Sequence, residues 1–287
     1  MPRLTAYDHV DADVVQMLRS HAAERDRILG LLTVLFELDR RVRAAWLWGS
    51  FLRGDSDDLS DLDIWLLVPA ECVGGFAAVI KSFCEAAGNV VSSGENPHNA
   101  PPDGRYLGAL IAGSHGLHHL DIYWQCVTAG ALPEGPVLFN RLDELPVDAS
   151  PAAEAAPARD DSPLAQCRGK LSFIWLMLSV TAKYLARDPA SDMALIAYPR
   201  NSFEECIVIL DLQNSIGEVN WTAPGEPLAK VDFLRLILEK TAVLEQACRT
   251  CGLDISTEAN PCLSRYLDMV EGIVRGSSST SPGGATR

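Results

Sequence analysis

Residues 60–68 read SDLDIWLLV, and this segment is the most informative part of the sequence about the fold. Its alternation of polar and apolar residues is typical of a β-strand with one buried face. The alternation places Asp61 and Asp63 on one face and an apolar row on the other. Two carboxylates about 7 Å apart at the start of an apolar strand repel each other unless a cation lies between them. Their hard oxygen atoms favour Mg²⁺ or Mn²⁺ as that cation.

A glycine-serine pair lies upstream of this strand. Residues 43–48 form a short β-prone run that ends at Gly49 and Ser50. Small residues at a strand end allow backbone N–H groups to approach an anion closely. A triphosphate is therefore expected at this point of the chain.

A third carboxylate follows in a later β-prone run, residues 117–127. Asp121 lies there between Leu120 and Ile122, which point to the opposite face of the strand. If this strand pairs beside residues 61–68, three carboxylates converge. His118 and His119 point to opposite faces, which argues against a metal shared by these two histidines.

Further elements follow from apolar periodicity and from glycine and proline positions. We expect helices at residues 13–38 (one long or two short) and 76–87, a short strand at 89–91, a loop at 92–105, and a hairpin formed by 106–111 and 117–127. A Gly-Ser-His-Gly turn at residues 113–116 would join the two hairpin strands.

The composition changes after residue 141. Residues 142–163 are rich in Ala, Asp and Pro, which is typical of a boundary between domains. Beyond them the apolar spacing is helical at 164–187, 193–197, 203–212, 228–251 and 261–274. We therefore predict an α+β protein, with a mixed β-sheet and flanking helices followed by an α-helical bundle. The predicted parts are a sheet domain at 1–145, a linker at 146–163, a helical substrate-binding domain at 164–275 and a disordered tail at 276–287.

The charge balance narrows the range of partners. The chain has 24 Lys and Arg against 38 Asp and Glu, a formal net charge of −14, and no basic run. A nucleic-acid partner is therefore not expected, whereas a cationic small molecule would be attracted. No membrane association is expected, because the longest apolar stretch, residues 171–180, is half of the roughly 20 residues that a membrane helix needs. Residues 1–13 lack the pattern of a signal peptide, so a cytoplasmic location is expected, as a monomer or a homodimer.

The order of these motifs resembles the nucleotidyltransferase superfamily typified by DNA polymerase beta. Gly49-Ser50 and Arg53-Gly54 ahead of Asp61-Leu62-Asp63 look most like its antibiotic-modifying members, the aminoglycoside and lincosamide nucleotidyltransferases. The resemblance covers residues 46–68 closely and residues 117–125 moderately. Over the helical half it is architectural.

The resemblance implies attack by an acceptor hydroxyl on the α-phosphorus of ATP or another NTP, with pyrophosphate leaving. Asp61 and Asp63 would hold the metal bound to the triphosphate, and Gly49 and Ser50 would hold its β- and γ-phosphates. Asp121 would act as a metal ligand, as a general base, or as both. The expected product is an AMP (NMP) adduct of a small, cationic antibiotic.

Several residues keep two interpretations. Arg53 belongs to the family pattern and either contacts a phosphate or pairs with Asp55 or Asp58. Lys170 either reaches the triphosphate or is solvated. Glu204 and Glu205 follow a predicted helix N-cap at residues 201–202, where acidic residues are favourable regardless of function.

Two other functions remain open at this point. One is a regulator that resembles the minimal nucleotidyltransferase antitoxins, which bind and modify a protein partner; those chains typically lack an added helical half. The other is a nucleic-acid polymerase of the same superfamily, which would need a basic groove.

Overall fold

The computed structural model describes residues 10–126, 135–144, 162–216 and 219–278. The chain forms two compact units. The first, here called the sheet unit, comprises Ala22–Gly113 and His118–Arg159. The second, the helical unit, comprises Met1–His21, Ser114–Leu117 and Asp160–Arg287.

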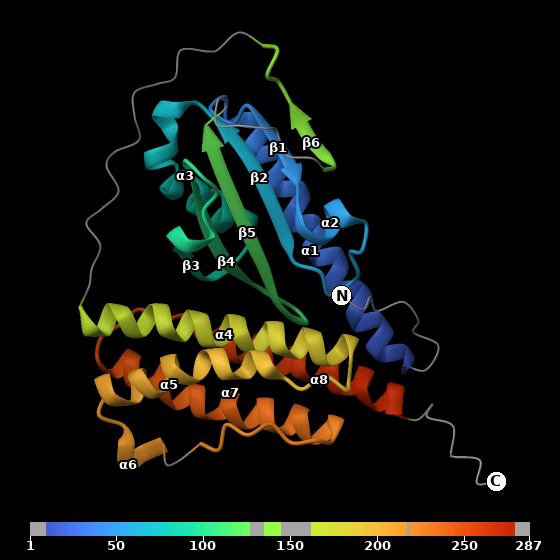
Figure 1. Ribbon diagram of the computed structural model, residues 1–287, viewed down its shortest axis with the longest axis vertical. Coiled ribbons are helices and arrows are strands. Elements are labelled where there is room, and N and C mark those ends of the chain that lie inside the picture. The colour runs from blue at the N-terminus through green and yellow to red at the C-terminus, as the bar shows by residue number, and fades with distance from the viewer. Residues whose placement is uncertain (1–9, 127–134, 145–161, 217–218, 279–287) are drawn as a thin grey trace, which may run out of the picture. The chain divides into compact units, whose positions relative to one another are not determined.

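A six-stranded mixed sheet forms the centre of the sheet unit (Figure 1). Its strands are β1 (Ala44–Leu47), β2 (Leu62–Val68), β3 (Val90–Glu95), β4 (Gly104–Gly113), β5 (Gly116–Cys126) and β6 (Val137–Asn140). They lie in the order β3-β4-β5-β2-β1-β6. The β2 and β5 strands pair in parallel, whereas β1 pairs antiparallel with β2 and with β6, and β3 with β4. This finding confirms the predicted mixed sheet.

One face of the sheet carries the core. The helices α1 (Ala12–Leu38) and α3 (Phe76–Ala87) bury apolar side chains against β2 and β5 in one hydrophobic cluster. The apolar row of residues 62–68 points into this cluster, so Leu62 and Ile64 are fully buried. The opposite face has a much smaller apolar cluster of Ala44, Trp46 and Leu67. Polar side chains can therefore be displayed on that face.

The helical unit contains α4 (Pro163–Arg187), η3 (Ala194–Ile196), α5 (Ala197–Ile209), α6 (Gln213–Ile216), α7 (Pro227–Thr250) and α8 (Ala259–Ser278). Ser162 caps α4 by accepting a hydrogen bond from the Ala165 N–H, and Pro163 occupies the first turn, where a missing N–H is harmless. The α4 helix contacts α5, α7 and α8. An α+β chain with a helical C-terminal part is therefore confirmed.

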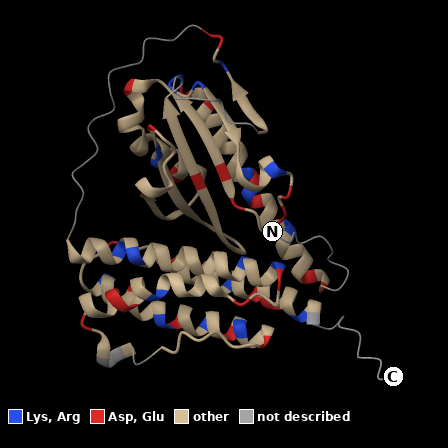
Figure 2. Cartoon of the chain, in the orientation of Figure 1, with Lys and Arg blue, Asp and Glu red and all other residues tan. Residues whose placement is uncertain are grey.

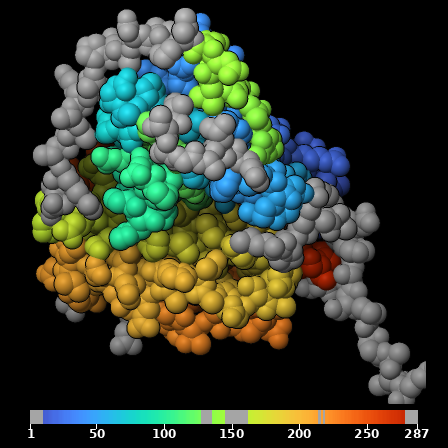
Figure 3. Space-filling view, turned by 45° about the horizontal axis from the view of Figure 1, so that its top comes forward, coloured from blue at the N-terminus to red at the C-terminus, as the bar shows by residue number. Residues whose placement is uncertain are grey.

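Several local predictions were wrong. Residues 92–105 are not all loop, because β3 continues to Glu95, the short helix η2 covers Pro97–Asn99, and β4 starts at Gly104. Glycines and prolines marked the bend here, but strand pairing between β3 and β4 extended both strands. A short helix that the sequence analysis did not include, α2, covers Gly49–Arg53. The edge strand β6, whose atoms lie at the surface in light green in Figure 3, was not predicted.

Two predictions at the helical end also change. The α5 helix begins at Ala197, so Glu204 and Glu205 lie within it and cannot act as its N-terminal residues. The α8 helix continues to Ser278, beyond the predicted start of the tail at residue 276. The predicted linker lies, except for residues 162–163, outside the described residues, as does the tail from residue 279. None of the helices described is both long and apolar enough to cross a membrane.

Candidate active site

The site begins with the register between β2 and β5. These two strands are parallel, and Asp63 lies directly opposite Asp121. Figure 2 shows the acidic residues of the two strands as neighbouring red segments. The neighbouring residues Leu62, Ile64, Leu120 and Ile122 are fully buried on the core face, so both aspartates point to the opposite face. The pairing that would bring Asp121 beside Asp63 is therefore present.

The turn before α2 packs against Asp63. Gly49 has a φ of +56°, and a Cβ at this position would overlap the carboxylate of Asp63. The Trp48 N–H also donates to the Asp63 carbonyl oxygen, at 2.9 Å. Only glycine combines this left-handed backbone with this close approach without strain. The sequence analysis explained the small residue by the approach of an anion. The structure adds a second reason, because the carboxylate of Asp63 leaves no room for a side chain at Gly49.

His119 lies between two of the three carboxylates. Its Nε2 atom is 3.0 Å from Oδ1 of Asp121, and its Nδ1 atom is 3.7 Å from Oδ2 of Asp61. Burial alone lowers the pKa of His119, but the charges of Asp121 and Asp61 outweigh burial and raise this pKa to about 10. An imidazolium therefore neutralises part of the negative charge that the strand pairing concentrates here.

Tyr106 of β4 contacts Asp121 from the other side. Its hydroxyl donates a hydrogen bond to Oδ1 of Asp121, the same oxygen that faces His119. Burial, together with the negative charge of Asp121, raises the pKa of Tyr106, so its hydroxyl stays protonated. Among the described residues, no hydrogen bond or ion pair engages the other oxygen, Oδ2 of Asp121. Asp121 is thus held through one oxygen and presents the second.

Aromatic rings continue the site face beyond the carboxylates. The next pair in the β2–β5 register is Trp65 and Tyr123, whose rings stack with centroids 5.3 Å apart. Trp48 packs on Trp65 at 5.3 Å, and Tyr106 packs on Tyr123 at 5.2 Å. This packed row continues along β2 and β5 directly after Asp63 and Asp121 and fixes the strand segments that carry them.

The loop before β2 is fixed by side chains of the sheet unit itself. Arg25 of α1 donates to the carbonyl oxygens of Asp57 and Ser60, at 2.7 and 3.4 Å. Asp57 accepts hydrogen bonds from Leu59 N–H and the Ser60 hydroxyl, so this acidic residue stabilises the loop. Arg53 pairs with Asp55 at 3.1 Å. Of the two roles considered for Arg53, phosphate contact and pairing with a nearby aspartate, the structure contains the second.

The three predicted metal ligands do not yet meet at one point. Within the described ranges, no three His, Cys, Asp or Glu side chains are arranged as a ready metal site. His119 lies between two of the three predicted ligands, 3.0 Å from Asp121 and 3.7 Å from Asp61. The donor set itself fits a hard divalent cation, because Asp63 faces Asp121 and Asp121 presents an unengaged carboxylate oxygen. The ligand roles of Asp61, Asp63 and Asp121 therefore remain predictions.

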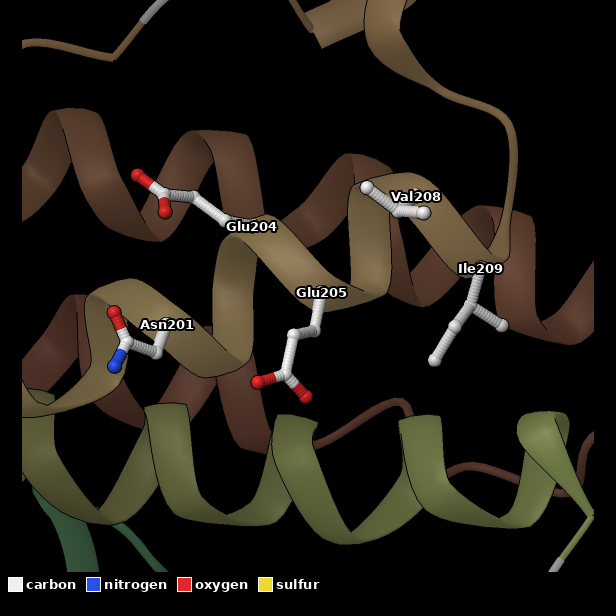
Figure 4. A pocket seen from close by; sticks show the side chains of 5 residues that line it. All are labelled: Asn201, Glu204, Glu205, Val208 and Ile209. Carbon is white, nitrogen blue, oxygen red and sulfur yellow. The ribbon is translucent and has the colours of Figure 1, made fainter.

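Lys170 belongs to the helical unit and is paired there. Its ammonium group contacts the carboxylate of Glu205 on α5. Glu205 lines a cavity of about 410 Å³ together with Asn201, Glu204, Val208 and Ile209. Figure 4 shows Glu205 and Ile209 pointing toward α4. Glu204 pairs with Arg200 at 2.7 Å, so both carboxylates of this cavity are neutralised within the unit.

Sequence reasoning missed His119, Tyr106 and Arg25 as supports of the site. His119 was detectable, because residues two apart on a strand share a face and His119 precedes Asp121 by two. Tyr106 and Arg25 carried no signal, because their contacts depend on the β4–β5 pairing and on the placement of α1.

Comparisons with known proteins add little. No family model matches the chain, and no curated protein matches it. The chain is similar to the crystal structure of an aminoglycoside 6-adenyltransferase from Bacillus subtilis, with 12% identity and a TM-score of 0.29, over 86% of this chain and 97% of that one. It is also similar to a structure of the GLD-2/RNP-8 complex, with 14% identity and a TM-score of 0.25, over 88% of this chain and 77% of that one. At these scores the likenesses define neither fold nor function, which rest on the strand register and the side chains.

Proposed function

We propose that this protein is a metal-dependent nucleotidyltransferase that transfers AMP, or another NMP, from an NTP to a hydroxyl of a small molecule. The observation that carries the proposal is the in-register parallel pairing of β2 and β5, which sets Asp63 opposite Asp121. Two carboxylates opposite each other on the sheet face away from the core, with a glycine turn packed against one of them, suit a metal-bound triphosphate.

Asp61 and Asp63 are the residues that would hold Mg²⁺ or Mn²⁺, and Gly49 and Ser50 would hold the β- and γ-phosphates. The metal would neutralise charge on the triphosphate and on the leaving pyrophosphate. Arg53 is taken up by Asp55 and Lys170 by Glu205, so neither is required to contact a phosphate in this proposal.

Asp121 receives the acceptor in this proposal. Its Oδ1 atom is occupied by Tyr106 and faces His119, which fixes the carboxylate in one orientation. Its Oδ2 atom accepts the hydrogen bond of the attacking hydroxyl, and takes up that proton as the new O–P bond forms and the bond to pyrophosphate breaks. Tyr106 and His119 are positioning residues, because they act through Asp121.

The acceptor is proposed to be cationic, such as an aminoglycoside or a lincosamide. A net charge of −14 attracts cations and disfavours polyanions such as nucleic acid. Cation attraction does not select one acceptor, so the panel in the test below is broad.

The test incubates the full chain with Mg²⁺, labelled ATP and a panel of aminoglycosides and lincosamides, and detects NMP adducts by mass spectrometry. We expect an adduct and released pyrophosphate with wild type, and loss of both with Asp63→Asn. The matched control is Asp143→Asn, which removes an exposed carboxylate of the same unit and should leave the product unchanged.

Two results would contradict the proposal. One is an absence of NTP binding by wild type in the presence of Mg²⁺, and the other is unimpaired transfer by Asp63→Asn. Transfer to a protein target alone would favour the antitoxin-like function instead.

A further inference from the structure

The outer face of α1 carries an apolar stripe that the sheet unit leaves uncovered. Leu31, Val34 and Leu38 are 40%, 53% and 72% exposed. Their spacing of three and four residues places them on one side of the helix. Ile28, Leu32 and Phe36 occupy the opposite side and are buried against the sheet. The helix is therefore apolar on two faces, of which only one has a partner.

A small residue lies beside this stripe. Gly30 is exposed, and a Cβ at this position would have no atom within 4 Å. Glycine costs about 1 kcal/mol relative to alanine in a helix interior. Its presence on an open helix face leaves room for a side chain from outside to approach the backbone.

Two charged residues of opposite sign flank the stripe. Arg27 lies on the N-terminal side and Glu37 on the C-terminal side. Across the described residues, neither side chain forms an ion pair or a hydrogen bond, although the charge of Glu37 acts on Arg141, with which it lines the same pocket. One positive and one negative group therefore lie near opposite ends of one apolar stripe, each able to form an ion pair with a partner.

We infer that this face binds a second copy of the chain, with the two α1 helices antiparallel. A two-fold axis midway between Gly30 and Val34 is also midway between Arg27 and Glu37. Val34 of each copy then packs over Gly30 of the other, and Arg27 of each copy meets Glu37 of the other. In a two-fold interface every contact occurs twice, so a single register satisfies both charges and fills both glycine positions.

This self-complementarity favours a second copy over a different partner. A one-sided acidic or basic ligand would satisfy one of the two charges and leave the other unpaired. One helix face is smaller than the roughly 800 Å² per partner of a standard interface, so a dissociation constant in the micromolar range is expected.

The test measures molar mass by sedimentation over a range of concentrations, using the full chain. Wild type should approach twice the chain mass of 31.1 kDa as its concentration rises. Arg27→Glu and Glu37→Arg should each weaken association at least about tenfold, because each places like charges opposite one another. The double variant with both changes should restore association, because it exchanges the charges without losing either pair.

Two further variants test whether association depends on this face of α1 or on any exposed apolar residue. Val34→Glu should abolish association, whereas Leu236→Glu, at a matched exposure of 42% on α7, should leave it unchanged. Circular dichroism confirms that each variant is folded. A wild type that stays monomeric at all concentrations, an intact dimer in Val34→Glu, or a double variant no better than the single ones would overturn the inference.

Discussion

The site face of the sheet unit and the surface of the helical unit hold their carboxylates in opposite ways. In the helical unit, surface carboxylates pair with cations: Glu204 with Arg200, Glu205 with Lys170, and Asp268 and Glu271 with Arg235. On the site face of the sheet, strand register sets Asp63 opposite Asp121, and the one imidazolium of His119 lies between Asp121 and Asp61. Paired charges stabilise a packed bundle, whereas like charges held together retain affinity for a further cation.

The largest effect is expected from Asp63→Asn, which removes one of the gathered carboxylates. Nucleotidyl transfer should fall about 10³-fold, because an amide cannot neutralise a cation bound to the triphosphate. The melting temperature should stay the same or rise, since one of several like charges has been removed. Initial rates of adduct formation and thermal melts measure the two effects. A variant that lost stability and activity together would indicate that Asp63 is structural.

Replacing His119, the positively charged side chain between Asp61 and Asp121, should have the next largest effect. Without Mg²⁺, His119→Gln should lose about 2–3 kcal/mol of unfolding free energy, because Asp121 and Asp61 remain without a facing positive charge. Millimolar Mg²⁺ should then stabilise the variant more than it stabilises wild type, by binding the folded state alone.

Urea unfolding with and without Mg²⁺ measures this difference. His98→Gln changes an exposed histidine of the same unit and serves as the control, with no effect in either condition. If Mg²⁺ stabilised His119→Gln and wild type equally, the metal would not bind at the position that His119 occupies.

A buried carboxylate of the helical unit provides the third prediction. Burial raises the pKa of Glu245 to about 7, although Arg249 lowers it by pairing at 3.3 Å. The unfolded chain releases this proton near the ordinary glutamate pKa of 4.5, so stability should fall as pH rises from about 4.5 to 7 and then level off.

Glu245→Gln should remove that part of the pH dependence. The variant should be more stable than wild type by roughly 2 kcal/mol at pH 8 and show no such gain at pH 4. Transfer activity should not change, because Glu245 belongs to the helical unit's packing. Urea unfolding at the two pH values decides the matter, and a gain that is equal at both would refute the assignment.

The smallest effect concerns the partly exposed ion pairs of Arg235. Arg235→Gln should cost less than about 1 kcal/mol, because Arg235, Asp268 and Glu271 are all partly exposed. The loss should shrink further in 1 M salt, where exposed charges are screened. Unfolding curves at low and high salt measure this loss of unfolding free energy. A loss of several kcal/mol would show that the ion pairs of the helical unit contribute as much stability as His119 does in the sheet unit.

The strands with the strongest alternation could be predicted from the sequence, whereas the supports Tyr106 and Arg25 could not. Residues 61–68 and 117–127 carry both a period of two and the aspartates, so β2, β5 and their carboxylate face follow from local pattern. The four-residue strand β6 has no such pattern, because its position depends on pairing with β1. His119 was considered only as a partner of His118, and its position between Asp61 and Asp121 depends on the β2–β5 register.

The parallel pairing of β2 with β5 also determines how early during synthesis of the chain the site can form. The chain between these strands contains α3, β3 and β4, so all three are synthesised before β5 can pair with β2. Contacts between distant segments form late, since loop closure precedes any gain from pairing. A chain still being synthesised therefore has no facing aspartates until β5 is complete, and cannot capture a nucleotide before its sheet is assembled.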